Sequence, residues 1–270
     1  MSKLLYEKRD RIAYLTLNRP EAKNAIDPEL HQLLWDAWED FRDDDALDVA
    51  ILTGTGDAFC AGADLKTYIP PIIESRPDGV WVRENVKTGI GGLTRGLHRI
   101  YKPVIAAVNG WALAGGLETA LACDIRIASE NAMFGSFEAR RGYHHGDGGI
   151  ARLVNICGAG VALEMLLTAE PIDAQRALQC NMVSRVVPHD ELMAEAEKTA
   201  RQILRNSQRA VRSAKETIMD VIGRPLDEQL KIDAINGYSS ADPDETMELL
   251  GRFYEKRDAG RAGSHETPLD

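Results

Sequence analysis

Residues 104–149 decide the fold, and they read VIAAVNGWALAGGLETALACDIRIASENAMFGSFEARRGYHHGDGG. Two short runs, the apolar residues 104–108 and the mixed residues 124–128 (DIRIA), read as strands, the first of them buried. A turn rich in glycine and alanine follows the first run, and an alanine-rich helix carrying Glu118 comes next. Glu138 lies beyond the second run. The stretch therefore predicts a strand–turn–helix–strand unit with a carboxylate on either side of its second strand.

The same alternation of strands, turns and helices extends outward from this unit. Residues 4–17 read as two strands around a charged turn, and 49–53 as a short buried strand. From about 207 to 257 the pattern changes to three amphipathic helices, separated by Gly-Arg-Pro and Asp-Pro. We therefore expect an α/β protein whose core and site occupy residues 1–195 and whose helical region occupies residues 196–270.

Charge and composition exclude several classes of protein. The 270 residues carry 32 basic and 42 acidic side chains, a net charge of −10, which argues against a general nucleic-acid binder. The N-terminus is charged and predicts no signal peptide, and the apolar segment 104–123 contains Asn109, Glu118 and three glycines, so we reject it as a membrane span. The four cysteines form no CxxC pair and predict core thiols of a cytoplasmic protein without a metal site.

The two glutamates allow two readings each. Glu118 is either a first-turn residue favoured by the helix dipole or a buried catalytic carboxylate. Glu138 precedes Arg140 and Arg141 and so is either a surface ion-pair partner or the second member of an acid–base pair.

Two glycine-containing turns complete the pattern. CAGAD (60–64) follows one strand and ALAGG (112–116) follows another. Each is an ordinary tight turn if taken alone. Two backbone N–H groups that converge from such turns would form an oxyanion hole, which stabilises an enolate or a tetrahedral oxyanion.

Taken together, these motifs resemble the enoyl-CoA hydratase/isomerase (crotonase) superfamily. The resemblance rests on AFCAGADLK, PVIAAVNGWALAGGLETALACDIRIASENAMFG and FEARRG, and continues through LTAEPIDAQRALQCNMVSRVVP to FYEKR. It covers about Leu4 to Arg257. It implies a spiral of repeated β-β-α units with a helical C-terminal region that supports a homotrimer or a dimer of trimers. It also implies an acyl-coenzyme A substrate, without a membrane or nucleic-acid partner and without a separate cofactor.

The resemblance implies roles for individual residues. The amides of Ala63 and Gly115 match the positions that hold the thioester carbonyl, and Glu118 and Glu138 match the two catalytic glutamates. Positions matching the coenzyme A contacts are Arg19, Lys23, Ala61, Asp64, Lys66 and, from a neighbouring subunit, Lys256.

The implied reaction is the reversible syn hydration of a trans-2-enoyl-CoA to a 3-hydroxyacyl-CoA, a step of fatty acid metabolism. Conjugation to the thioester lets negative charge move onto oxygen, where two N–H donors stabilise it. By the family pattern, Glu118 activates water and Glu138 delivers a proton to the α-carbon.

The chain departs from the family pattern after Glu138, where GYHHGDGG replaces an apolar glycine-proline turn. His144, His145 and Asp147 stand here. They are a hydrogen-bonded cluster or subunit contact, contacts for a polar acyl group, or a sign of altered chemistry. The last reading is a retro-Claisen hydrolase of a β-diketone or β-ketoacyl-CoA that uses Asp147 with His144 or His145. A double-bond isomerase and a non-catalytic acyl-CoA binder are further alternatives.

Overall fold

The computed structural model describes residues 2–74 and 87–261, except the side chains of residues 72, 73 and 256–261. The chain forms two compact units, one up to Arg205 and the other from Asn206. The division follows helix α7 (Leu192–Leu204), so this helix belongs whole to the first unit, whereas the sequence placed the division at residue 195.

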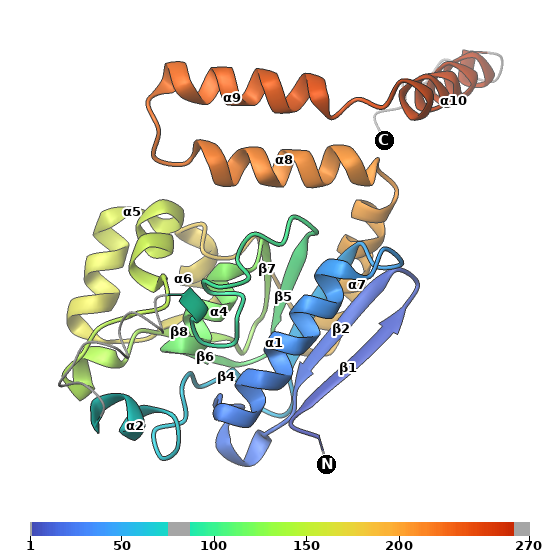
Figure 1. Cartoon of the computed structure of the whole chain (residues 1–270). Helices are drawn as coiled ribbons and strands as arrows, with labels where there is room; N and C mark the ends of the chain where they lie inside the picture. The colour runs from blue at the N-terminus through green and yellow to red at the C-terminus, as the bar shows by residue number, and fades with distance from the viewer. Residues whose placement is uncertain (1, 75–86, 262–270) are drawn as a thin grey trace. The chain divides into compact units, whose positions relative to one another are not determined.

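The first unit contains a central six-stranded sheet (Figure 1). In spatial order it contains β1 (Leu4–Arg9), β2 (Ile12–Leu17), β3 (Val49–Gly54), β5 (Val104–Val108), β7 (Ile125–Ser129) and β10 (Arg185–Val187). β1 and β2 pair antiparallel, and the other neighbours are parallel. Asp10 and Arg11 join β1 to β2 with φ of 52° and 66°, the left-handed values that a two-residue hairpin turn needs. The two expected strands around a charged turn are confirmed.

Strand β3 shows why this sheet is buried on both faces. Its side chains alternate, so Val49 and Ile51 contact one apolar cluster while Ala50 and Leu52 contact another. The first cluster is covered by α7 through residues that include Leu192. The second cluster is the larger one and continues toward the site.

A second, four-stranded sheet lies across the larger cluster. It contains β4 (Ala58–Cys60), β6 (Trp111–Leu113), β8 (Met133–Gly135) and β9 (Ile172–Asp173). The chain alternates between the two sheets, since β3 leads to β4, β5 to β6 and β7 to β8. Each pair advances the chain by one turn of a spiral, and the expected spiral of repeated units is confirmed.

Helices fill the spaces that the strands leave. Helix α1 (Pro28–Asp43) begins where the Asp27 carboxylate accepts the Leu30 N–H at 2.8 Å. Among the described residues, the first unit also contains the helices η1 (Pro20–Ala22), α2 (Ile69–Glu74), α4 (Gly115–Ala122), η3 (Glu138–Arg141), α5 (Gly149–Thr168), α6 (Ala174–Gln179) and η4 (His189–Glu191).

Helix α5 is the one helix among the described residues whose length and hydropathy would allow it to cross a membrane. A single match of this kind is weak evidence, and Gly158 interrupts the helix with φ 79° and ψ 160°. The segment 104–123 is not one helix, because it comprises β5, β6 and α4.

The second unit contains the three helices that the sequence predicted, α8 (Gln208–Val221), α9 (Leu226–Ser239) and α10 (Pro243–Arg261). The Ser207 hydroxyl caps α8 by accepting the Ala210 N–H. Large apolar side chains of α8 and α9 are exposed: Ile218, Ile222, Leu226, Leu230, Ile235 and Tyr238. Exposed apolar side chains in this number are typical of an association surface.

Candidate active site

The two glycine-containing turns lie against each other at the ends of β4 and β6, which pair in the four-stranded sheet. A Cβ atom added to Gly62 would lie 2.8 Å from the Gly115 nitrogen, and one added to Gly115 would lie 3.5 Å from the Ala63 nitrogen. Gly116 is closer still, since its added Cβ would lie 2.0 Å from the Cys60 carbonyl oxygen. Only glycine allows this approach at residues 62 and 116.

The amides of Ala63 and Gly115 are available to a ligand. Gly115 is the first residue of α4, so its N–H has no partner within the helix. Among the described residues, neither amide donates a hydrogen bond to a backbone carbonyl. Ala114, which precedes α4, has φ 53° and ψ −124°, a conformation that costs a non-glycine residue about 1–3 kcal/mol and is common at functional sites.

Glu118 is buried, 3% exposed, on α4. Its Oε1 accepts the N–H of Asp147 at 2.7 Å and the N–H of Gly149 at 2.9 Å. Gly149 is the first residue of α5, so the carboxylate lies at a helix N-terminus, which favours negative charge. The reading of Glu118 as a simple first-turn residue of α4 does not account for these contacts.

Glu138 is equally buried, at the start of η3. Its Oε2 accepts the Ser136 hydroxyl at 3.3 Å. The neighbouring arginines point elsewhere, because Arg140 pairs with Glu170 and Arg141 donates to the carbonyl of Phe137. The surface ion-pair reading of Glu138 is therefore wrong.

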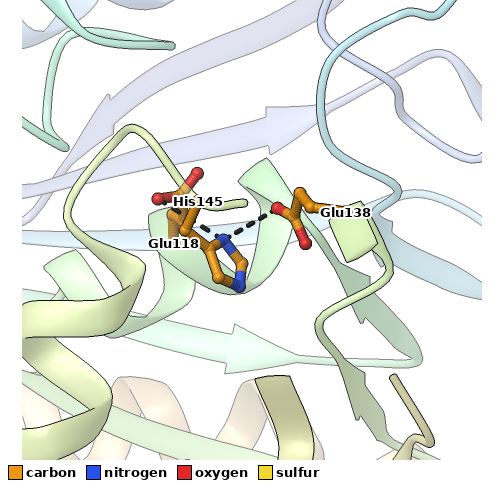
Figure 2. Close-up of side chains that lie close together, drawn as sticks. All are labelled: Glu118, Glu138 and His145. Atoms are coloured by element: carbon orange, nitrogen blue, oxygen red, sulfur yellow. Dashed lines mark ion pairs between the residues drawn. The ribbon is translucent and has the colours of Figure 1, made fainter. Parts of the chain in front are cut away.

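His145 lies between the two glutamates (Figure 2). Its Nδ1 is 2.7 Å from Oε1 of Glu138 and 3.5 Å from Oε1 of Glu118, and its side chain is 0% exposed. Neither ring nitrogen makes an aligned hydrogen bond to a described residue, so these close contacts become ion pairs when the imidazole is protonated. Burial lowers the pKa of His145, but the two carboxylates outweigh burial and raise the pKa to about 9. The imidazole is therefore protonated at neutral pH.

Asp147 and His144 have different surroundings. Burial, followed by the charge of Glu118, raises the pKa of Asp147 to about 6, although the nearby Arg95 opposes the shift. Oδ1 of Asp147 accepts the Ile90 N–H at 3.1 Å and lies 3.0 Å from the Arg95 guanidinium. His144 is exposed, and its Nδ1 lies 2.7 Å from the carbonyl oxygen of His145. The structure thus brings His145 and Asp147 to the glutamates but not the His144 side chain.

Several of the residues predicted to contact coenzyme A lie around the CAGAD turn. Arg19 lies 3.1 Å from the Asp64 carboxylate, which also accepts the N–H groups of Lys66 and Thr67. This network fixes the loop that follows Ala63.

The remaining coenzyme A residues are on the same loops or outside the described part. The Ala61 N–H donates to the Lys23 carbonyl, and the Lys23 ammonium pairs with Asp57. Lys66 is exposed. The Lys256 side chain lies outside the described residues. Their contact with coenzyme A stays a prediction.

Sequence reasoning missed the structural role of Gly149. A Cβ atom there would lie 2.8 Å from Nδ1 of His145 and 2.9 Å from Cγ of Glu118. The signal was the glycine pair after Asp147, which marks a close approach of backbone to side chains. Ser136, which donates to Glu138, carried no comparable signal.

The structure thus brings together two adjacent turn amides, two buried carboxylates and a buried imidazole with a raised pKa, groups that can perform acid–base chemistry. The family model described as enoyl-CoA hydratase/isomerase matches residues 7–261. The chain therefore belongs to the enoyl-CoA hydratase/isomerase family, and it is an enzyme of the enoyl-CoA hydratase type.

Individual relatives agree with this assignment. The chain is 37% identical over 260 residues to a crotonyl-CoA hydratase from Syntrophomonas wolfei, covering 95% of this chain and 96% of the relative. It is 42% identical over 205 residues to the mevalonyl-coenzyme A hydratase sidH from Aspergillus fumigatus, covering 76% and 73%. The crystal structure of an enoyl-CoA hydratase from Bacillus anthracis matches with a TM-score of 0.83 at 33% identity, covering 94% of this chain and 97% of that chain.

Proposed function

We propose that this enzyme catalyses the reversible syn addition of water to a trans-2-enoyl-CoA, giving a 3-hydroxyacyl-CoA. The observation that carries the proposal is the pair of buried carboxylates, Glu118 and Glu138, in a unit that also holds two adjacent amides to which no described carbonyl is hydrogen-bonded. Relatives named as hydratases of several acyl-CoA thioesters support it.

In the proposed mechanism the amides of Ala63 and Gly115 bind the thioester oxygen. Charge develops on that oxygen as water attacks the β-carbon, and the loss of one oxyanion donor typically costs about 3 kcal/mol. The two donors come from rigid turns, so they need no reorganisation when the charge forms.

Glu118 is the base for the attacking water. Its Oε1 is occupied by two backbone N–H groups, whereas Oε2 accepts no hydrogen bond from a described residue. Oε2 is therefore the oxygen that can bind and deprotonate water. Acid–base catalysis of this kind contributes about 10²–10⁴-fold to the rate.

Glu138 is the acid that delivers a proton to the α-carbon. It must carry a proton at that moment, and the protonated His145 at 2.7 Å is its nearest proton source. The reaction needs neither a metal nor a redox cofactor, since only a proton and a hydroxide are added.

The proposal extends to the coenzyme A site and the assembly. Lys23 and Lys66 are exposed or partly exposed cations that suit phosphate groups. Leu163 and Leu167 of α5 are 54% and 77% exposed, which together with the exposed apolar side chains of α8 and α9 supports a homotrimer or dimer of trimers. We also propose a cytoplasmic location and a role in fatty acid metabolism.

Hydration accounts for the site better than retro-Claisen cleavage does. That reaction requires Asp147 with His144 or His145, but Oδ1 of Asp147 contacts Ile90 and Arg95, His144 is exposed, and Nδ1 of His145 faces the two glutamates. An isomerase would need only one of the two glutamates.

The test is to incubate the purified enzyme with crotonyl-CoA and with longer enoyl-CoA thioesters and to identify the products by mass spectrometry. We expect a mass gain of one water and a 3-hydroxyacyl-CoA product. If the enzyme leaves enoyl-CoA thioesters unchanged but cleaves a β-ketoacyl-CoA, we would assign it as a retro-Claisen hydrolase and not as a hydratase. Coenzyme A binding without any turnover would instead indicate a non-catalytic acyl-CoA binder.

A further inference from the structure

A single atom, Nδ1 of His145, faces both catalytic carboxylates. It lies 2.7 Å from Oε1 of Glu138 and 3.5 Å from Oε1 of Glu118 (Figure 2). The ring is fully buried, and no described residue makes an aligned hydrogen bond to either nitrogen. A buried polar ring is normally hydrogen-bonded, so the position of this one needs a functional explanation.

Hydration leaves the two glutamates in the wrong protonation states for a second turnover. Glu118 has gained a proton from water, and Glu138 has given one to the α-carbon. One proton must return from Glu118 to Glu138 before the next substrate reacts. Both carboxylates are buried, so direct exchange of that proton with bulk water is restricted.

We propose that His145 carries this proton back from Glu118 to Glu138 through its Nδ1 atom. The proposal rests on the hydratase function proposed above. His145 is then a positioning and proton-carrying residue that acts through the two glutamates and does not touch the substrate.

The proton balance closes over one cycle. The resting site holds an imidazolium and two carboxylates, and the Nδ1 proton first passes to Oε1 of Glu138. Water attacks the β-carbon, its proton goes to Glu118, and the electron pair of the double bond forms the enolate. Glu138 then protonates the α-carbon, which leaves a neutral imidazole, a neutral Glu118 and an ionised Glu138.

The last transfer restores the resting site. The proton passes from the Glu118 carboxyl group to the vacant Nδ1, after a rotation of the carboxyl that presents the protonated oxygen. Such terminal torsions are soft, and a neutral Glu118 accepts weaker hydrogen bonds from Asp147 and Gly149 than an ionised one does. Nε2 keeps its proton throughout.

The surrounding charges support an imidazolium in the resting enzyme. The pKa of His145 is about 9, because the two carboxylates outweigh the opposing effect of burial. Two of the groups around the site, Asp147 and Arg152, carry opposite charges. The titratable groups on the elements packed around it are Glu118, Glu138, Tyr143, Asp147, Arg152 and Arg95.

The first test compares His145→Gln with wild type in steady-state hydration of crotonyl-CoA between pH 6 and 10. We expect kcat to fall about 10²-fold while KM changes less than threefold, because the fully buried ring of His145 presents no exposed surface to a substrate. The basic limb of the wild-type kcat profile, near pH 9, should be absent from the variant. The matched control is His144→Gln, the exposed neighbour, which should stay within twofold of wild type. An unchanged kcat and basic limb in His145→Gln would overturn the proposal.

Chemical rescue separates proton transfer from packing. His145→Ala leaves a space the size of the lost ring. Added imidazole should raise the kcat of this variant at least tenfold. A series of substituted imidazoles should restore kcat in proportion to their basicity. Rescue by apolar rings of the same size as well as by imidazole would indicate packing and would overturn the proton-carrying role.

A measurement without substrate separates this proposal from the proposed function. Nuclear magnetic resonance of isotope-labelled histidine should show one ring titrating near pH 9 in the free enzyme, and that titration should shift downward in Glu138→Gln. If this holds while no enoyl-CoA is hydrated, the hydratase assignment fails rather than the charge state. The ligand atoms of Glu118, Glu138 and His145 lie within 4.8 Å of one another, as in a metal site. Stoichiometric divalent metal in the purified protein, by elemental analysis, would replace the proton relay by a metal centre.

Discussion

The imidazole of His145 and the carboxylate of Glu138 approach to 2.7 Å in a fully buried contact. Glu138 begins η3, which follows β8, and His145 lies in the loop between η3 and α5. Burial without a counter-charge would cost several kcal/mol for either group. The pair therefore couples the stability of the fold to the protonation state of the site.

This coupling predicts a pH dependence of stability. The pKa of His145 is raised from 6.5 to about 9 in the folded protein, so its contribution is fully present below pH 6.5 and is lost as pH rises through 9. A shift of that size corresponds to about 3 kcal/mol. We expect the free energy of unfolding of wild type relative to His145→Gln to decrease by that order between pH 6 and 10.

Urea unfolding at a series of pH values measures this difference. The comparison with His145→Gln cancels the titration of groups distant from the site, and His144→Gln serves as a control with no such trend. A wild-type advantage that grows as pH rises would show that the imidazole is neutral in the folded protein.

The close packing around Gly149 predicts that a side chain at this position displaces the groups of the site. A methyl group there would lie 2.7–2.9 Å from atoms of His145 and Glu118, so Gly149→Ala must displace both. A displacement of about 1 Å at a catalytic group costs on the order of 10²-fold in rate. Gly146→Ala is the matched control in the same loop, because nothing lies within 4 Å of its added Cβ. Hydration rates of the two variants with matching circular dichroism spectra test this; equal rates would contradict it.

We expect replacement of Asp147 to have only a modest effect on hydration and on stability. Asp147→Asn keeps an oxygen for the Ile90 N–H but removes the charge that faces Arg95. We expect hydration to stay within about tenfold of wild type and stability to fall by about 1 kcal/mol. Assay of crotonyl-CoA hydration and of unfolding checks both quantities. A loss of hydration beyond 10³-fold would mean that the Asp147 carboxylate carries part of the chemistry.

The strand pattern was predictable because it depends on local alternation. Val49 to Leu52 is a continuous apolar run, as a strand buried on both faces must be, and the structure places it between two apolar clusters. The charged hairpin at Asp10 was predictable for the same local reason. The C-terminal boundary of the first unit was less predictable from the sequence, because α7 joins this unit only through contacts with distant strands.

The site was predictable in its members but not in its contacts. Both glutamates and both turns carry local motifs, whereas the position of His145 depends on how the loop after η3 folds back over α4. Nothing in the spacing of GYHHGDGG tells His145 from His144, although the structure buries the first and exposes the second. Only the hydrogen bonds seen in the structure allow rejection of the two non-catalytic interpretations, a first-turn residue for Glu118 and a surface ion-pair partner for Glu138.

The glutamate pair gives the most direct test of the central claim, through a double-mutant cycle in crotonyl-CoA hydration. Glu118→Gln and Glu138→Gln should each lower kcat by about 10²–10⁴-fold. The double variant should fall at most about tenfold below the slower single variant, because residues that act as a unit are not additive. The exposed Glu170→Gln is the matched control. A wild-type-like kcat in either single variant would contradict the two-glutamate mechanism.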